Sequence, residues 1–318
     1  MDLIISHNHC PDGFCAAYIA KKKYPEAEVL FLDHGFVPPF GTVKGKDVLV
    51  LDFSWSTRAD NDAMAHDAKS FRILDHHKTA QATLEGAPYA VFDMKRSGAG
   101  LAWDYLFGKD SIKLKVLADC SFEYNLPLER PWYVNYVEDR DLWNWKFPKS
   151  KEICAYLGTL PFTFEAWDRL GEVDLKDALV LGCGALAHID HYVREAVQQA
   201  QTGILQGYKT AVLNVPYLNC SEVGNELAKT HEVSLTWFER GDGMIQFSLR
   251  SIGDIDVSAI AKIFGGGGHR NAAGFQMPYE KGRELIDQIL GRDLKIYETA
   301  AAARNLERDD YKAKYGIS

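Results

Sequence analysis

The sequence contains no CxxC pair of cysteines and no run of about 18 apolar residues. Its six cysteines are scattered along 318 residues, which is typical of free thiols in a reducing compartment rather than of a disulfide framework. The chain opens on an apolar strand-like segment, without the basic stretch that precedes the apolar core of a secretory signal. These absences predict a soluble, cytoplasmic protein that has no membrane partner.

An excess of positive charge is also missing. There are 36 Lys and Arg residues against 44 Asp and Glu residues, which gives a net charge of -8. A duplex-binding protein with a broad basic surface is therefore excluded, and we expect no duplex DNA partner. The acidic excess lies before Tyr208, where 22 basic residues face 29 acidic ones; from Tyr208 onward the counts are 14 and 15.

The composition itself is that of a folded protein, with 47% hydrophobic and 25% charged residues and no repeat or low-complexity segment. A chain of this length predicts two domains. We place a first domain at residues 1–195, a linker at 196–207 and a second domain at 208–318. The last of these would end in a helical tail over residues 300–314.

The first third alternates apolar runs with helix-like segments, which predicts an α/β fold. Continuous apolar runs are expected when a parallel sheet is covered by helices on both faces. Strands are expected over Leu3–Ser6, Glu28–Leu32, Asp47–Phe53 and Ser70–Leu74. The middle of the chain reads as mostly helical, including Ser111–Tyr124 and a long linker helix over Asp174–Gln201. A smaller α/β unit follows.

Polar clusters follow the predicted strands, at the sheet edge where ligands of open parallel sheets bind. The clusters are His7 to Asp12, then Asp52, then Asp75-His76-His77, and further on Glu138 to Asp141. Together they offer the histidine nitrogens and carboxylate oxygens that bind Mn, Zn, Co or Fe.

Each cluster also has a plain structural interpretation. Asp52 alone reads as a helix cap or a turn residue, and Glu138 to Asp141 reads as a solvated charged turn. The triplet Asp75-His76-His77 is harder to explain without a ligand, because three polar residues directly ending an apolar strand are costly to bury.

These motifs resemble the DHH phosphoesterase superfamily. The similarity rests on HNHCPDG from residue 7, the aspartate of VLVLD, LDHH and EDRDLW, in that order. GGGGHRNAAG over residues 265–274 resembles the signature of the DHHA1 domain. The resemblance covers residues 1 to about 293, and it implies two divalent metal ions, with Mn²⁺ expected and Mg²⁺, Co²⁺ or Zn²⁺ as alternatives.

The resemblance also implies roles for individual residues. Asp52 would bridge the two metals, Asp75 would orient its neighbours, and His77 would lie near the scissile phosphate, so that Asp75 and His77 form the catalytic pair. Asp139 matches the last metal aspartate best, with Asp141 as its competitor. The implied metal ligands are His7, Asp12, Asp52, His76 and Asp139.

The first motif departs from the family, which carries two aspartates as DxD where this chain has Cys10-Pro11-Asp12. Three explanations stay open: His9 replaces the carboxylate, the first metal binds less tightly, or a Cys10 thiolate favours Zn over Mn. We prefer a Cys10 that does not bind metal.

The C-terminal signature suits an anionic ligand, because glycines let the backbone approach closely and expose N–H groups. His269 and Arg270 add a donor and a charge, and Arg250 is a further candidate for phosphate or base. The alternative interpretation of the glycine run is a flexible linker, and that of Arg250 is a surface ion pair. The predicted substrate-binding residues are Arg250, Gly266, Gly267, Gly268, His269 and Arg270.

A helix start and three tryptophans have structural interpretations. Ser97-Gly98 opens a helix and could donate N–H groups to phosphate, but an ordinary N-cap is the preferred reading. Trp132, Trp143 and Trp145 are expected in the core.

The sequence therefore predicts a phosphodiesterase that hydrolyses short oligonucleotides or linear dinucleotides, such as pGpG, pApA or nano-RNA, to mononucleotides. The acidic charge argues against long substrates. The alternatives are a RecJ-like single-strand exonuclease and a catalytically impaired nucleotide-binding sensor. The candidate protein partner is a second copy of the chain, in a homodimer.

Overall fold

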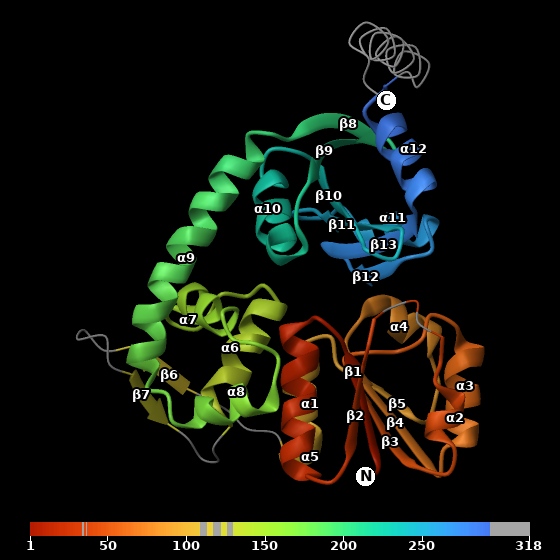
Figure 1. Ribbon diagram of the computed structural model, residues 1–318, viewed down its shortest axis with the longest axis vertical. Helices are drawn as coiled ribbons and strands as arrows, with labels where there is room; N and C mark the ends of the chain where they lie inside the picture. Colours follow the sequence, from red (N-terminus) through yellow and green to blue (C-terminus); the bar gives the residue numbers. More distant parts are fainter. Residues whose placement is uncertain (34, 36, 109–112, 117–121, 126–129, 293–318) are drawn as a thin grey trace, which may run out of the picture. The chain divides into compact units, whose positions relative to one another are not determined.

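A computed structural model describes residues 1–33, 35, 37–108, 113–116, 122–125 and 130–292. The chain divides into two compact units, Met1–His191 and Tyr192–Ser318. Figure 1 names their helices and strands. Among the described residues, no helix is both long and apolar enough to cross a membrane.

The N-terminal unit is built on a five-stranded parallel sheet in the order β2-β1-β3-β4-β5. Its strands are β1 (Leu3–His7), β2 (Glu28–Leu32), β3 (Asp47–Leu51), β4 (Ser70–Asp75) and β5 (Ala90–Phe92). This confirms the predicted parallel sheet.

Both faces of this sheet are buried. Ile4 packs into one core, whereas its neighbours Leu3 and Ile5 pack into another on the opposite face, because successive strand residues point to opposite sides. Helices α1 (Pro11–Lys23) and α5 (Gly98–Phe107) cover one face, and α2 (Phe40–Val43) and α3 (Arg58–Asp67) cover the other (Figure 1). The continuous apolar strands follow from this double coverage.

The other described elements of the N-terminal unit are helices and one pair of antiparallel strands. The helices are α4 (Lys78–Thr83), α6 (Trp132–Asp141), α7 (Ser150–Leu157), α8 (Phe164–Asp168) and the 3₁₀ turn η1 (Arg169–Gly171). The helix expected over Ser111–Tyr124 was wrong: β6 (Lys113–Val116) and β7 (Phe122–Asn125) pair antiparallel there. The segment KLKV alternates apolar and charged residues, which favours a strand over a helix.

The long helix expected over Asp174–Gln201 is α9 (Leu175–Val197), which has 23 residues and ends earlier because Gln201 begins a strand. The boundary between the two units falls within this helix, after His191. The C-terminal unit has a six-stranded mixed sheet in the order β12-β13-β11-β10-β9-β8. Its elements are β8 (Gln201–Leu205), β9 (Tyr208–Asn214), η2 (Tyr217–Asn219), α10 (Cys220–Leu227), β10 (Val233–Glu239), β11 (Met244–Arg250), α11 (Val257–Ile263), β12 (Gly267–His269), β13 (Ala272–Pro278) and α12 (Tyr279–Ile289).

The core of this unit is formed by its strands together with α11 and α12. Residues 201–205, within the expected linker, form the edge strand β8. The helical tail expected over residues 300–314 lies outside the described residues. An α/β chain with a parallel sheet followed by a smaller α/β unit is the fold class that the sequence predicted.

Candidate metal centre

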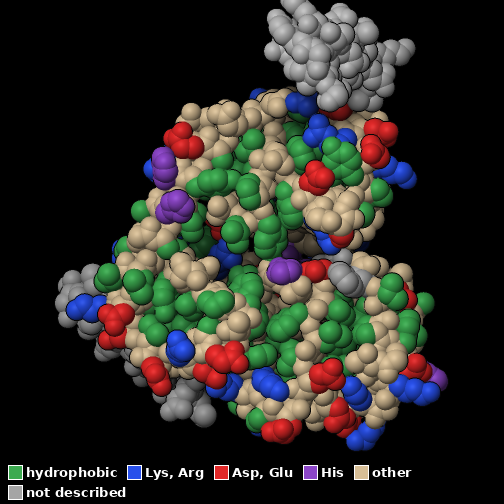
Figure 2. All heavy atoms as spheres, in the orientation of Figure 1, with side chains coloured by type: hydrophobic (Ala, Val, Ile, Leu, Met, Phe, Trp, Pro, Cys, Tyr) green, Lys and Arg blue, Asp and Glu red, His purple; other side chains and the backbone are tan. Residues whose placement is uncertain are grey.

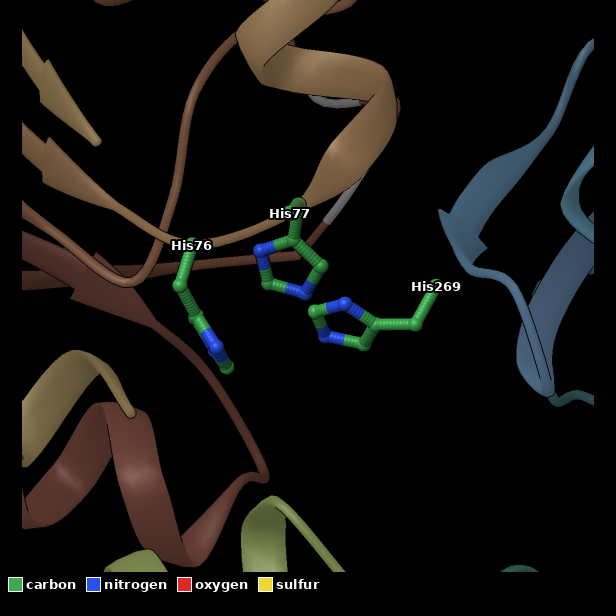
Figure 3. Close-up of side chains that lie close together, drawn as sticks. All are labelled: His76, His77 and His269. Carbon is green, nitrogen blue, oxygen red and sulfur yellow. The ribbon is translucent and has the colours of Figure 1, made fainter. Parts of the chain in front are cut away.

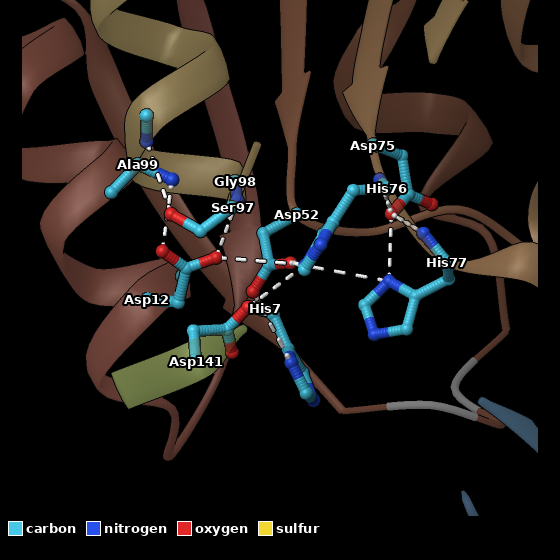
Figure 4. Close-up of polar contacts among 12 residues, drawn as sticks. His7, Asp12, Asp52, Asp75, His76, His77, Ser97, Gly98, Ala99 and Asp141 are labelled. Atoms are coloured by element: carbon cyan, nitrogen blue, oxygen red, sulfur yellow. Dashed lines mark hydrogen bonds and ion pairs between the residues drawn. The ribbon is translucent and has the colours of Figure 1, made fainter. Parts of the chain in front are cut away.

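Three neighbouring strands deliver polar side chains to one edge of the N-terminal sheet. His7 is the last residue of β1, Asp52 directly follows β3, and Asp75 is the last residue of β4. Because the strands are parallel and adjacent, their carboxyl ends meet at this edge, as Figure 4 shows.

The Nε2 atom of His76 lies among three carboxylates. It is 3.1 Å from Asp52 Oδ1, 3.4 Å from Asp141 Oδ2 and 3.7 Å from Asp12 Oδ2. Asp12, Asp52 and His76 are each only 1% exposed. Such a concentration of negative charge away from water is costly unless a cation neutralises it.

Asp12 is held by the N-terminus of α5. Its carboxylate accepts hydrogen bonds from Gly98 N at 2.5 Å and from Ala99 N at 3.0 Å. A Cβ atom on Gly98 would come within 2.4 Å of the Asp52 Cβ, so only glycine lets the helix approach this closely. Ser97 is an ordinary N-cap, as expected, and accepts from Gly100 N at 3.1 Å. The N–H groups at the start of α5, which were considered as donors to a phosphate, therefore donate to the Asp12 carboxylate instead.

Asp52 has a left-handed backbone, with φ at 51°. A non-glycine residue pays strain energy for this conformation, and such strain is concentrated at functional sites. The conformation places the Asp52 carboxylate between three histidines: besides His76, His7 Nδ1 lies 3.7 Å away and His77 Nδ1 lies 3.9 Å away. Asp52 is thus the shared centre of the cluster.

Asp75 fixes the two residues that follow it. Its Oδ1 atom accepts the backbone N–H groups of His76 at 2.7 Å and His77 at 3.1 Å, and it lies 2.7 Å from His77 Nδ1. Figure 3 draws the two histidine rings at the end of β4. Asp75 thus orients both histidines, although its buried Oδ2 atom has no hydrogen-bond partner.

Asp139 does not join the cluster, contrary to the preferred assignment. Both of its carboxylate oxygens accept backbone N–H groups, Oδ1 from Lys146 at 2.9 Å and Oδ2 from Phe147 at 3.0 Å. Asp141, the competing candidate, points at His76 instead, and its Oδ2 atom has no hydrogen-bond partner. Asp139 closes the turn after α6, and Asp141 contributes the carboxylate.

Glu138 contacts residues that position the start of α5. Its Oε2 atom accepts the N–H of Ser97 at 3.2 Å, and its Oε1 atom pairs with Arg96 at 3.3 Å and Arg130 at 3.2 Å. Glu138 thereby helps to fix the start of α5, which in turn holds Asp12. Sequence reasoning missed this link because the two arginines carry no motif that relates them to Glu138.

The structure also bears on the first motif, with His9 and Cys10, and on the three tryptophans. His9 is exposed and belongs to none of the clusters of possible metal ligands among the described residues, whereas Cys10 lies near His7 and Asp52. Trp132 and Trp145 pack against the core as expected, but Trp143 is 39% exposed.

The electrostatics reflect these positions. Burial, reinforced by the Asp141 and Asp52 charges, raises the pKa of Asp12 well above its ordinary value. Burial also raises the pKa of Asp141. Burial acts the same way on Asp52, but hydrogen bonds from His7 and His76 outweigh it and hold the pKa of Asp52 well below its usual value.

The histidine pair responds to the neighbouring carboxylates. Burial lowers the pKa of His76, but the Asp141 and Asp52 carboxylates outweigh it and raise that pKa well above the ordinary value. Burial of Asp75 is likewise outweighed by the charge and hydrogen bond of His77, which lower the pKa of Asp75 to about 2. Without a cation, the raised pKa values of Asp12, Asp141 and His76 favour proton binding, which reduces the negative charge of the cluster.

Among the described residues of the N-terminal unit, three overlapping groups of side chains offer metal-ligand atoms within 4.8 Å of one another, and all three contain Asp52. They are Asp12/Asp52/His76, His7/Cys10/Asp52 and Asp52/Asp75/His77. A shared carboxylate with histidine and carboxylate donors on either side suits a pair of divalent cations. The donor set and the partnerless oxygens of Asp75 and Asp141 fit such ions.

The predicted substrate-binding residues lie in the C-terminal unit. A Cβ on Gly266 would be 2.1 Å from Gly274 O, and Gly268 has φ at 135° with a Cβ position 2.7 Å from Ala272 O. These glycines are thus required for close pairing of β12 with β13, which rules out the flexible-linker alternative. Gly267 pairs with Gly274 in the same hairpin, and His269 also lies on β12 (Figure 3).

The two arginines have protein partners. Arg250 donates to Ser248 Oγ, Leu249 O and Ser221 Oγ, each at 2.8 Å. Arg270 donates to the backbone oxygen of Asp254 at 2.7 Å and remains exposed. A role for either in substrate binding stays a prediction.

Comparison with known proteins agrees with the motifs and the fold. Residues 208–292 match the family model of the DHHA1 domain. RecJ from Thermus thermophilus, solved with Mn²⁺, is similar with a TM-score of 0.50 and 16% identity, over 91% of this chain and 51% of that protein. The chain thus spans about half of that RecJ.

Two other proteins are similar. The pGpG-specific phosphodiesterase PggH from Vibrio cholerae has a TM-score of 0.46 and 13% identity, over 92% of this chain and 98% of that one. An uncharacterized protein, R106, of Acanthamoeba polyphaga mimivirus is 27% identical over 315 residues, covering 88% of this chain and 70% of that protein.

The class is therefore defined by an α/β fold shared with RecJ and by a matched DHHA1 domain. Residues 208–292 thus form a DHHA1 domain, as the GGGGHRNAAG motif predicted, and the fold shared with RecJ agrees with the resemblance of the N-terminal motifs to the DHH superfamily.

Proposed function

We propose that this protein is a metal-dependent phosphodiesterase that hydrolyses short oligonucleotides or linear dinucleotides to mononucleotides. The observation that carries the proposal is the buried cluster in which His76 Nε2 lies within 3.7 Å of the Asp12, Asp52 and Asp141 carboxylates. The proposed metal ligands are His7, Asp12, Asp52, His76 and Asp141, with Asp141 in place of the expected Asp139.

The proposed chemistry is in-line hydrolysis of a phosphodiester. When bound, two divalent cations, with Mn²⁺ as the expected species, lower the pKa of water and neutralise charge on the phosphate. Asp52 would contribute to the binding of both ions, because it belongs to all three groups of ligand atoms in the N-terminal unit. Asp75 orients the His77 ring, and burial of His77 is outweighed by the Asp75 carboxylate, which raises the pKa of His77. The oriented His77 ring is suited to hydrogen-bond a phosphate oxygen.

The proposed length preference rests on charge. On the face drawn in Figure 2, acidic and basic side chains of the described residues are interspersed, and no continuous basic tract is visible. The sequence from Tyr208 onward is nearly neutral. A long single strand would favour an extended basic groove, whereas a dinucleotide needs only local donors.

The test compares substrates and variants. Purified full-length protein with Mn²⁺ is given pGpG, a pentamer and a 20-mer, and rates are measured for the wild type, Asp52→Asn and the control Asp67→Asn. Asp67 is an exposed residue at the end of α3, so its variant should keep full activity. Asp52→Asn should lose at least about 10²-fold, the loss seen when one preorganised charge-stabilising group is removed.

Other outcomes would redirect the proposal. Intact pGpG beside measurable binding of pGpG would instead support a nucleotide-binding sensor. Equal rates on the 20-mer and the dinucleotide would support a RecJ-like exonuclease, and full activity of Asp52→Asn would refute the two-metal site.

A further inference from the structure

The turn between β1 and α1 carries a cysteine that its structural position does not explain. Cys10 is the N-cap residue of α1, a position where Ser, Thr, Asp and Asn are favoured because their side-chain oxygens accept backbone N–H groups. The Cys10 side chain makes no such capping bond. A thiol is a weaker hydrogen-bond acceptor than these oxygens, so helix capping does not account for a cysteine at this position.

The turn itself brings this thiol back toward β1. His9, directly before Cys10, has φ at 51°, a left-handed conformation that is strained for a non-glycine residue. As a result, the Cys10 sulfur, one His7 ring nitrogen and one Asp52 carboxylate oxygen lie within 4.8 Å of one another. The turn thus places sulfur, nitrogen and oxygen donors around one point.

Next to this point lies the carboxylate-rich cluster. Asp12 and Asp52 are almost completely buried, and the partnerless Oδ2 atom of Asp141 faces His76. Three carboxylates gathered around one histidine favour a cation independently of the cysteine.

We propose that Cys10 is a metal ligand, and that the position formed by His7, Cys10 and Asp52 takes a thiophilic cation such as Zn²⁺ in preference to Mn²⁺. On binding, the Cys10 thiol releases its proton to solvent and a sulfur–metal bond forms. Three protein ligands leave a coordination position open, as in catalytic zinc sites. Thiolate donors select softer ions, whereas carboxylates suit Mn²⁺ and Mg²⁺. This inference rests on the proposed two-metal function and assigns the identity of one of its ions.

The test replaces the native metal with Co²⁺, because a cobalt–thiolate bond gives a ligand-to-metal charge-transfer band in the near-ultraviolet. The full-length wild type, Cys10→Ser and Cys183→Ser are compared after equilibrium dialysis against Co²⁺. Cys183 is an exposed thiol on α9 and serves as the matched control. We expect the band in the wild type and in Cys183→Ser, and its loss in Cys10→Ser.

A second measurement addresses metal choice. Competition between Zn²⁺ and Mn²⁺ is followed in the wild type and in Cys10→Asp, which restores a carboxylate at this position. The wild type should prefer Zn²⁺, and Cys10→Asp should shift this preference toward Mn²⁺ by at least about tenfold, the change that even a residue supporting a ligand can cause.

The outcomes separate this inference from the proposed function. If the wild type binds Co²⁺ and hydrolyses pGpG without the charge-transfer band, or if Cys10→Ser keeps the band, the cysteine ligand is refuted and the phosphodiesterase stands. If the wild type binds no Co²⁺, Zn²⁺ or Mn²⁺, the inference and the two-metal function both fail.

Discussion

At the scale of single residues, the site works by giving similar side chains different duties. Asp75 and Asp139 accept backbone N–H groups and thereby fix the chain, whereas Asp52 and Asp141 direct oxygens toward His76. Asp12 does both, because it also binds the first amides of α5. The second duty is costly in a folded protein because the charges are buried together. Carboxylates of both kinds occur side by side in the segment that ends α6.

The two aspartates at the end of α6 should therefore respond differently to substitution. Asp139→Asn leaves one backbone N–H without a carboxylate acceptor and should lower the free energy of unfolding by about 1–3 kcal/mol. Asp141→Asn relieves repulsion among the carboxylates, so it should not destabilise the metal-free protein but should weaken Mn²⁺ binding. Urea unfolding and calorimetric metal titration of both variants measure these effects. Weaker Mn²⁺ binding by Asp139→Asn at unchanged stability would reverse the two assignments.

The sequence alone locates most of this cluster, because His7, Asp52 and the Asp75 triplet directly follow apolar strands whose ends must meet. It does not separate Asp139 from Asp141. The two residues are two positions apart in one charged segment, and their roles are decided by the turn after α6, where Trp143 and Trp145 both adopt positive φ values. Nothing in the local pattern predicts that this turn folds back onto Asp139.

At the scale of elements, the site depends on how closely α5 approaches the sheet. The first amides of α5 bind Asp12, and Gly98 and Gly100 leave room for Asp52 and Glu138. The sequence predicted this helix and its Ser97 cap. It could not predict that the N-terminus would bind a carboxylate of the chain itself, because that contact joins residues 86 positions apart. The strands β6 and β7 were missed because short amphipathic segments fit both a helix and a strand.

Gly98→Ala tests the importance of this approach. Its Cβ would lie 2.4 Å from the Asp52 Cβ and 2.9 Å from Asp12 Oδ2, so α5 or the carboxylates must move. We expect a lower melting temperature and a loss of Mn²⁺ affinity of at least about tenfold.

Gly184→Ala provides the matched control for that substitution. Gly184 lies within α9, and its Cβ would have no atom within 4 Å, so alanine should stabilise the helix by about 0.5–1 kcal/mol. Unchanged metal affinity in Gly98→Ala would show that the close approach is not needed for the metal centre.

At the scale of the whole molecule, the uneven charge has a partial explanation. The excess of acidic residues lies before Tyr208, and it includes Asp12, Asp52, Asp75 and Asp141, which gather at one edge of the N-terminal sheet. Bound cations would cancel part of this charge, so the net charge of -8 overstates the negative potential that a substrate meets. Net charge thus bears on substrate length and not on whether nucleotides bind.

Salt dependence should reveal how many phosphates the protein contacts. The logarithm of kcat/KM falls with the logarithm of salt concentration by about 0.7 for each phosphate of a single strand that is neutralised. A dinucleotide such as pGpG has two phosphates, so between about 50 and about 200 mM KCl at constant Mn²⁺ we expect a slope no steeper than about -1.4. A 20-mer should give the same slope, because the proposed site engages only the end of a strand. A markedly steeper slope for the 20-mer would show an extended phosphate track, and would place the protein with exonucleases that follow long single strands.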